Sequence, residues 1–175
     1  MLKIKTFKEH LLESTNIGLD NINKLILLLG DVDIANAKLT KSIYGLTSPD
    51  RIYIDIDGIN QYMSEDYLLF IILHELAHYK KIETMGRDFY LNFNLKYSFE
   101  EYLRTYKFEE DFANRWARYM MNKLFMIDIK HQDVDYETHP YNEFIKSNYN
   151  FLRDSVTNEE ELNNYLTNFV LYVRQ

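Results

Sequence analysis

The feature that most constrains the fold is a run in the middle of the chain, His74-Glu75-Leu76-Ala77-His78, which directly follows the apolar residues 67–73. Ser64, with acidic residues just after it, is a typical helix start, and lysines at 80 and 81 suit a helix end. An α-helix turns once in about 3.6 residues, so the two histidines project from one face and can reach a single metal ion. We therefore expect a helix over residues 64–81 that carries a metal site.

The residues of this run indicate which metal the site would bind. The chain has no cysteine, so histidine, aspartate or glutamate must supply the ligands. A zinc ion (Zn2+) accepts neutral imidazole nitrogens and keeps an open position for water in catalytic sites. We expect His74 and His78 to bind zinc and Glu75 to act as the general base that takes a proton from that water. The same pattern also arises by chance, and it can hold a purely structural metal.

A catalytic zinc site usually takes three protein ligands, so a third side chain is needed. The candidates are Glu109, Glu110, Asp111, His131 and His139. Glu110 shares one helical face with Asn114 and with alanines at 113 and 117, which would let that face pack closely against the histidine-bearing helix. Packing therefore favours Glu110, with Glu109 next. Asn114 could hydrogen-bond a ligating histidine.

The other candidates have simpler interpretations. Asp111 can pair with arginines on a solvated helix face. His131 and His139 lie in a polar stretch, where an exposed histidine is the ordinary expectation. His139 or Tyr136 could stabilise a developing oxyanion, but the spacing singles out neither.

The pattern along the chain predicts one α+β domain over residues 1–175. Helices are expected at 7–12, 20–29, 64–81, 98–124 (which could break near 105–107), 142–152 and 158–173. Residues 37–44 and 51–57 read as two strands joined by a turn at 45–50. Two such strands predict a small antiparallel sheet. Ser98 and Glu101 form a capping-box pattern, and Gly30 is a natural helix stop.

Charge and hydropathy narrow the classes of partner. The net charge is −7, and no dense lysine or arginine run is present, so binding to nucleic acid or to an anionic membrane is not expected. The longest apolar runs, 25–29 and 67–73, are too short to span a bilayer. The N-terminus lacks the pattern of a signal peptide, so the expected location is cytoplasmic. The sequence leaves the oligomeric state open.

These residues resemble the gluzincin-type zinc peptidases, and more narrowly the ImmA/IrrE-like family. The resemblance covers about residues 37–124 and rests on the strand 51–57, the run 74–78, and Glu110-Asp111-Phe112-Ala113-Asn114 followed by Ala117. It implies a zincin-like fold with His74, His78 and Glu110 as zinc ligands and Glu75 as general base. It also implies that the strand 51–57 is an edge that holds a substrate backbone in extended form.

Three functions are compatible with this sequence. The first is a zinc metallopeptidase, a hydrolase that makes limited cuts in a protein or peptide partner. The second is a non-catalytic protein of zincin fold, for example encoded by a phage or mobile element, in which zinc stabilises the fold. The chain has 15 tyrosines, which are favoured at interfaces and motivate this reading. The third is a metal-dependent hydrolase of a non-peptide substrate, for which no phosphate- or sugar-binding signature is seen.

Overall fold

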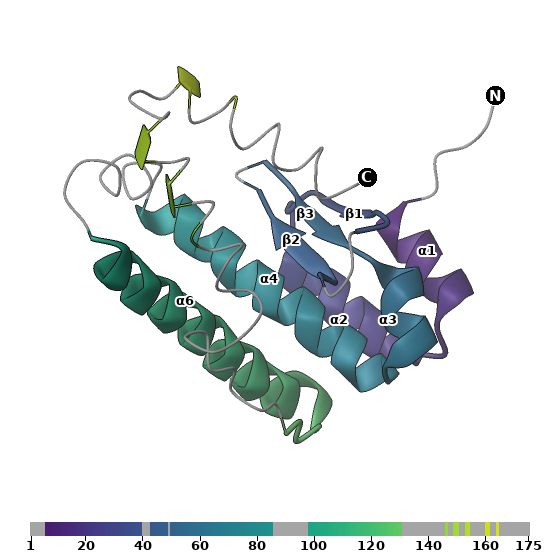
Figure 1. Ribbon diagram of the computed structural model, residues 1–175. Helices are drawn as coiled ribbons and strands as arrows, with labels where there is room; N and C mark the ends of the chain where they lie inside the picture. Colours follow the sequence, from purple (N-terminus) through teal and green to yellow (C-terminus); the bar gives the residue numbers. More distant parts are fainter. Residues whose placement is uncertain are drawn as a thin grey trace.

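The computed structural model describes residues 6–39, 43–48, 50–85 and 98–130, together with 146, 149–150, 153–154, 160–161 and 164. The elements in chain order are α1 (Phe7–Ser14), α2 (Leu19–Leu29), β1 (Ile34–Asn36), β2 (Gly45–Thr47), β3 (Ile52–Ile54), α3 (Ile56–Tyr62), α4 (Glu65–Met85), α6 (Phe99–Met120) and the π-helical turn η1 (Met121–Phe125). Figure 1 shows α4 lying between the small sheet and the long helix α6. The described part of the chain is therefore mixed α and β, and mostly helical.

Helices predicted from local signals are present close to the expected bounds. Helix α2 ends at Gly30, whose φ of 59° lies in the left-handed region that glycine adopts without strain. Ser98 and Glu101 form the predicted capping box of α6. That helix has no break at 105–107, where the Thr105 hydroxyl donates to the Glu101 carbonyl one turn back. The helices predicted at 142–152 and 158–173 lie almost wholly outside the described residues.

The sheet differs from the predicted antiparallel pair. The described strands have the order β1-β3-β2, with β1 parallel and β2 antiparallel to β3. The strand predicted at 37–44 is wrong for its described residues, 37–39 and 43–44, because the strands lie on either side of them and β2 falls inside the predicted turn. Ala37 and Leu39 are buried in a small apolar cluster with Leu46, so their apolar character reflects this burial.

Asp55 explains why the predicted strand 51–57 stops at Ile54. Its carboxylate accepts hydrogen bonds from the backbone N–H of Gly58 (2.8 Å) and of Leu39 (3.0 Å). The first bond caps α3, and the second holds the chain that leaves β1. The buried carboxylate of Asp55 thus ends the strand and starts helix α3.

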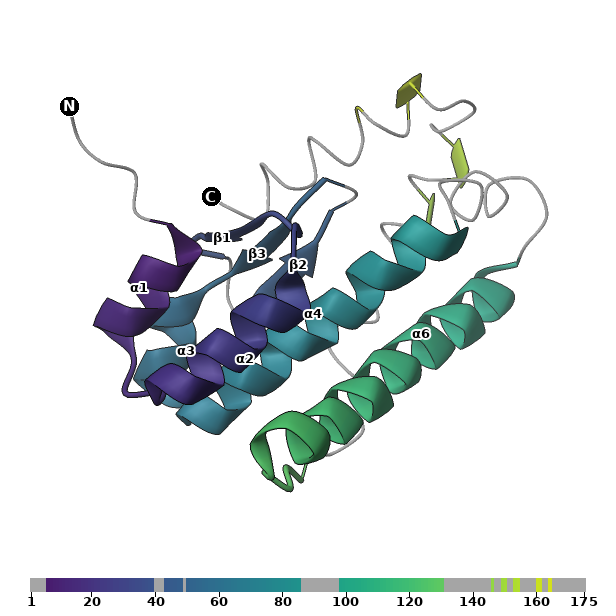
Figure 2. The same cartoon turned by 180° about the vertical axis from the view of Figure 1, so that it is seen from behind.

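Helix α4 is the central element of the core. Its first three turns bury Leu68, Leu69, Phe70, Ile72 and Leu73 almost completely. Burial of each such side chain contributes about 1.5–3 kcal/mol. Figure 2, from behind, shows α6 running alongside α4, with α2 in front of α4. This packing fixes the half of α4 that precedes the two histidines.

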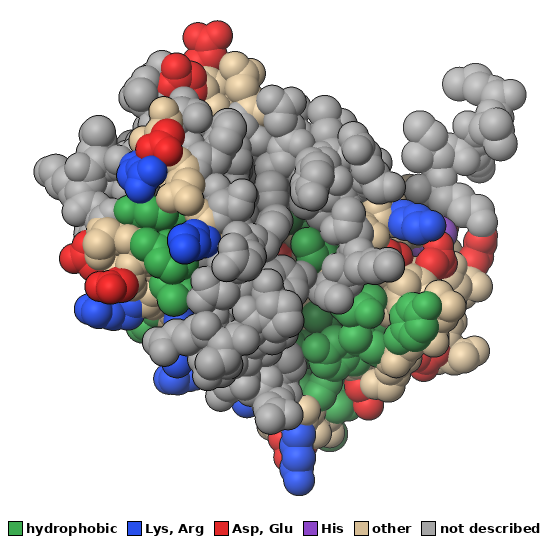
Figure 3. Space-filling model, in the orientation of Figure 1, with side chains coloured by type: hydrophobic (Ala, Val, Ile, Leu, Met, Phe, Trp, Pro, Cys, Tyr) green, Lys and Arg blue, Asp and Glu red, His purple; other side chains and the backbone are tan. Residues whose placement is uncertain are grey.

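The surface shows where apolar and charged groups gather. In Figure 3 apolar side chains are exposed on the face that carries α3 and the start of α4, while lysines and arginines are scattered over the described surface. None of the helices in the described part of the chain combines the length and apolar character that a membrane span requires.

Candidate metal centre

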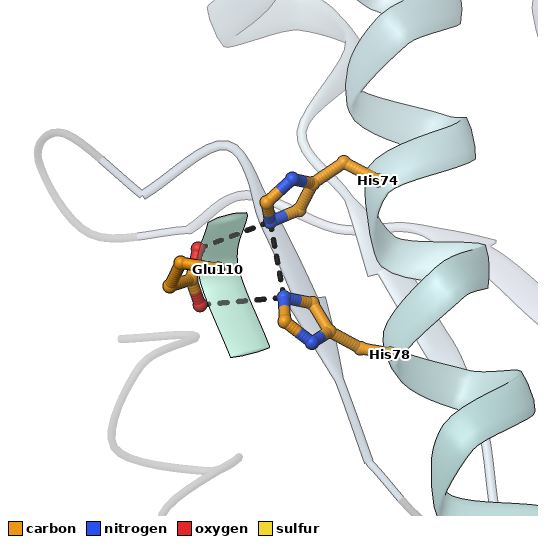
Figure 4. A group of neighbouring side chains, drawn as sticks. All are labelled: His74, His78 and Glu110. Atoms are coloured by element: carbon orange, nitrogen blue, oxygen red, sulfur yellow. Dashed lines mark hydrogen bonds and ion pairs between the residues drawn. The ribbon is translucent and has the colours of Figure 1, made fainter. Parts of the chain in front are cut away.

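Helices α4 and α6 bring three side chains together (Figure 4). The Nε2 atom of His74 lies 3.2 Å from Oε2 of Glu110, and Nε2 of His78 lies 3.3 Å from Oε1 of the same carboxylate. The two Nε2 atoms are 3.1 Å apart. The lone pairs of two ring nitrogens and one carboxylate this close repel one another unless a cation, either a proton or a metal ion, lies among them. His74, His78 and Glu110 could therefore hold a metal ion.

Small residues on α6 allow Glu110 to reach the histidines. Ala113 and Ala117, one and two turns further along the same face, are fully buried against the neighbouring elements. With no bulky side chain at these positions, α6 approaches α4 closely enough for a glutamate to span the gap. This is the packing that the sequence predicted, and the structure brings Glu110 rather than Glu109 to the cluster.

Asn114 holds His74 from the other side of its ring. Its side-chain oxygen lies 2.9 Å from Nδ1 of His74, and both residues are buried. An oxygen at this distance accepts a hydrogen bond from Nδ1–H, which leaves the lone pair of Nε2 directed at Glu110 and His78. The predicted hydrogen bond between Asn114 and a candidate ligand is thus present, and it favours the tautomer of His74 whose Nε2 can bind a metal.

The neighbouring charges shift the pKa values of the cluster. Burial lowers the pKa of His78, but the charge and hydrogen bond of Glu110 outweigh it and raise that pKa from 6.5 to about 9. Burial likewise raises the pKa of Glu110, but the charge and the hydrogen bond of His78 hold it well below its ordinary value. Without a metal, His78 therefore carries a proton at neutral pH and pairs with an ionised Glu110.

Glu75 lies beside this cluster, against strand β2. The Thr47 hydroxyl lies 2.7 Å from the carboxylate oxygen Oε2 of Glu75 and 2.9 Å from its backbone carbonyl. Gly45 leaves the room that the Glu75 side chain occupies, since a Cβ there would lie 2.6 Å from the Glu75 Cγ. Sequence reasoning missed both residues, because each lies in the stretch predicted as a turn and neither type of residue signals a role there.

Among the described strands β2, not the predicted strand 51–57, is the outer strand on this side of the sheet. Strand β3 pairs on both sides, which corrects the expectation that it forms an edge. The Asp55 N–H donates to the Tyr44 carbonyl, and the Ser48 N–H donates to the Arg51 carbonyl, each at 2.9 Å. In an antiparallel ladder the residues between these bonded pairs alternate, so the backbone N–H and C=O groups of Gly45 and Thr47 point to the outer edge.

The remaining candidates lie elsewhere. Glu109 forms an ion pair with Lys81 on α4. Asp111 is not among the residues that could hold the metal. His131, His139 and Tyr136 lie outside the described residues.

Comparison with known proteins identifies no significant match to this chain. No protein-family model matches the chain, and neither a curated protein nor a solved structure matches it significantly. The site must therefore be interpreted from its own geometry and chemistry.

Proposed function

We propose that this chain is a zinc-dependent peptidase of the gluzincin type that makes limited cuts in a protein partner. The observation that carries the proposal is the convergence of His74, His78 and Glu110, with Glu75 next to the first of them on α4. The resemblance of residues 74–78 and 110–114 to the ImmA/IrrE-like family supports the same assignment.

The ligand set fits zinc by its chemistry. Two imidazole nitrogens and one carboxylate are a ligand set found in catalytic zinc sites, which keep the fourth position open. The hydrogen bond from His74 to Asn114 provides the neighbour that ligating histidines usually have. When bound, zinc would supply a Lewis acid for the scissile carbonyl and lower the pKa of a coordinated water.

The protein side chains would carry the proton transfers. Glu75 is proposed to accept a proton from the attacking water and to pass it to the nitrogen of the leaving amine. Thr47 would keep the Glu75 carboxylate in one orientation through its 2.7 Å hydrogen bond. Gly45 would leave the space in which that carboxylate lies.

The outer edge of β2 supports a peptide as the substrate. The backbone groups of Gly45 and Thr47 that point to this edge can hydrogen-bond an extended peptide as an added strand. Because the side chain of Glu75 touches the same two residues, a peptide bound there would pass close to the proposed base. A peptide bond is therefore favoured over a phosphate ester or a glycoside.

The substitution Glu75→Gln tests the proposal. Zinc-loaded wild type and variant are incubated with a library of peptides prepared from whole-cell protein, and new N-termini are identified by mass spectrometry. We expect cleavage by the wild type, and loss of cleavage with retained zinc in the variant. Glu83→Gln is the matched control, since Glu83 lies on the same helix, is exposed and pairs only locally with Lys80.

Two results would count against this function. An unchanged cleavage rate in Glu75→Gln would remove Glu75 from the mechanism. A different outcome would support the non-catalytic alternative, in which the metal stabilises the fold. In that outcome the wild type binds zinc but cleaves nothing, and the Glu110→Ala variant has a lower thermal stability.

A further inference from the structure

Glu109, the residue beside Glu110, is held away from the candidate ligands by a lysine. Lys81 of α4 forms an ion pair with Glu109 of α6. The side chains of the two residues are only 20% and 17% exposed, so solvent screens the pair less than an ordinary surface pair. The pair thus joins the same two helices as the metal cluster does.

The surroundings of Lys81 fix the position of its charge. The Nζ atom lies 5.3 Å from the ring centre of Phe108 and 5.4 Å from that of Phe112, both on α6. Aromatic faces at this distance attract a cation. Two rings and one carboxylate therefore hold the lysine in one place, and Glu109 with it.

This ion pair lies close to the candidate metal centre. Lys81 follows His78 by one helical turn. Glu109 directly precedes Glu110, the third candidate ligand, on α6. A carboxylate that is mostly buried and loses its cation is strongly destabilised, so it protonates or moves to another cation. A metal bound by His74 and His78, one helical turn along α4 from Lys81, would be such a cation.

We propose that Lys81 is a positioning residue that keeps Glu109 off the metal, so that the metal binds only three protein ligands and keeps its fourth position open. This inference rests on the proposed function, because it takes His74, His78 and Glu110 as the ligands. It explains why Glu110 joins the candidate ligands while the adjacent Glu109 does not.

A purely structural role for the ion pair predicts a different outcome. If Lys81 only ties α4 to α6, its loss lowers thermal stability and leaves metal affinity unchanged or weaker. If Lys81 restrains Glu109, its loss frees a carboxylate that binds the metal, and metal affinity rises. The direction of the change in affinity therefore separates the two roles.

The first measurement is zinc affinity by competition with a chromophoric chelator, for wild type, Lys81→Met, Glu109→Gln and the double variant. We expect Lys81→Met to bind zinc about tenfold or more tightly, since a positive charge is lost and a carboxylate ligand gained. This gain should vanish in the double variant, by more than the separate effect of Glu109→Gln accounts for. Lys80→Met is the matched control, because Lys80 is exposed and pairs with Glu83.

The second measurement reports the open position directly. Cobalt replaces zinc, and the visible spectrum is followed while acetohydroxamate, a small ligand that needs the open position, is added. We expect a spectral change on addition to wild type, a weakened response in Lys81→Met and a restored response in the double variant. Should Lys81→Met not fold, Lys81→Gln takes its place, with the same direction of change and a smaller size.

The outcomes separate this inference from the proposed function. Wild type that binds no metal removes the proposed function and this inference with it. Wild type that binds metal and acetohydroxamate, with Lys81→Met equal to it or weaker in zinc affinity, overturns the role of Lys81 alone. Equal gains in Lys81→Met and in the double variant would also overturn it, because Glu109 would then not be the added ligand.

Discussion

The side-chain oxygen of Asn114 lies 2.9 Å from Nδ1 of His74, on the far side of the imidazole from Glu110. This contact crosses from α6 to α4 and orients the ring whose other nitrogen belongs to the metal cluster. Asn114, which is not itself a candidate metal ligand, therefore determines whether His74 presents a lone pair or a proton to the site.

Asn114→Ala should lower zinc affinity by about 10- to 100-fold, the usual effect of losing such a partner of a ligating histidine. Asn114→Asp keeps an oxygen acceptor of the same size and should stay near the wild-type affinity. The measurement is chelator competition at neutral pH. Equal losses in the two variants would show that the acceptor oxygen is not what matters.

The metal-free chain should show a stability maximum at mildly acidic pH. The pKa of His78 is raised from 6.5 to about 9 in the folded state, after burial is outweighed by Glu110, so its contribution is complete below 6.5 and is lost as the pH rises to about 9. The pKa of Glu110 is lowered, so its contribution is present above 4.5 and is lost as the pH falls below that value. Melting temperature against pH, with a chelator present, measures both. His78→Gln should flatten the alkaline fall, and an unchanged fall would contradict the assignment.

Zinc binding should release about one proton at pH 7. His78 carries a proton there in the metal-free chain, because Glu110 raises its pKa to about 9 against the effect of burial, and zinc binds only the neutral ring. Calorimetry in buffers of different ionisation enthalpy counts the protons. The number of protons released should decline as the pH approaches and then passes 9. A constant value of zero across this range would contradict the protonated state of His78.

Gly45→Ala should displace the Glu75 side chain and reduce cleavage, because the added Cβ would lie 2.6 Å from Glu75 Oε1. Thr47→Val removes the hydroxyl without changing the shape, and we expect a loss of about tenfold or more in kcat with little change in KM. Thr47→Ser keeps the hydroxyl and should recover most of the activity. Zinc content should be normal in all three. Equal activity of the valine and serine variants would exclude a role in cleavage for the hydrogen bond between Thr47 and Glu75.

The parts of the fold that the sequence predicted correctly depend on neighbours in the chain. The capping box at Ser98, the stop at Gly30 and the placement of two histidines on one helix all follow from residues within a turn or two. The approach of Glu110 was also predictable, because the alanines at 113 and 117 mark the face of α6 that packs against another helix.

The parts that the sequence did not predict depend on contacts between distant residues. Asp55 ends β3 because it caps α3 and also binds the N–H of Leu39, 16 positions away. Thr47 meets Glu75 across 28 positions, and this contact depends on the register of strands only three residues long. Such strands carry too little alternation for their register to be read from the pattern.

The most direct test of the central claim is metal analysis of the purified wild type beside Glu110→Ala and Glu109→Ala. The geometry predicts about one zinc per chain in the wild type and in Glu109→Ala, and little or none in Glu110→Ala. A wild type without bound metal after exposure to zinc, or a Glu110→Ala variant that binds zinc as tightly as the wild type, would contradict it.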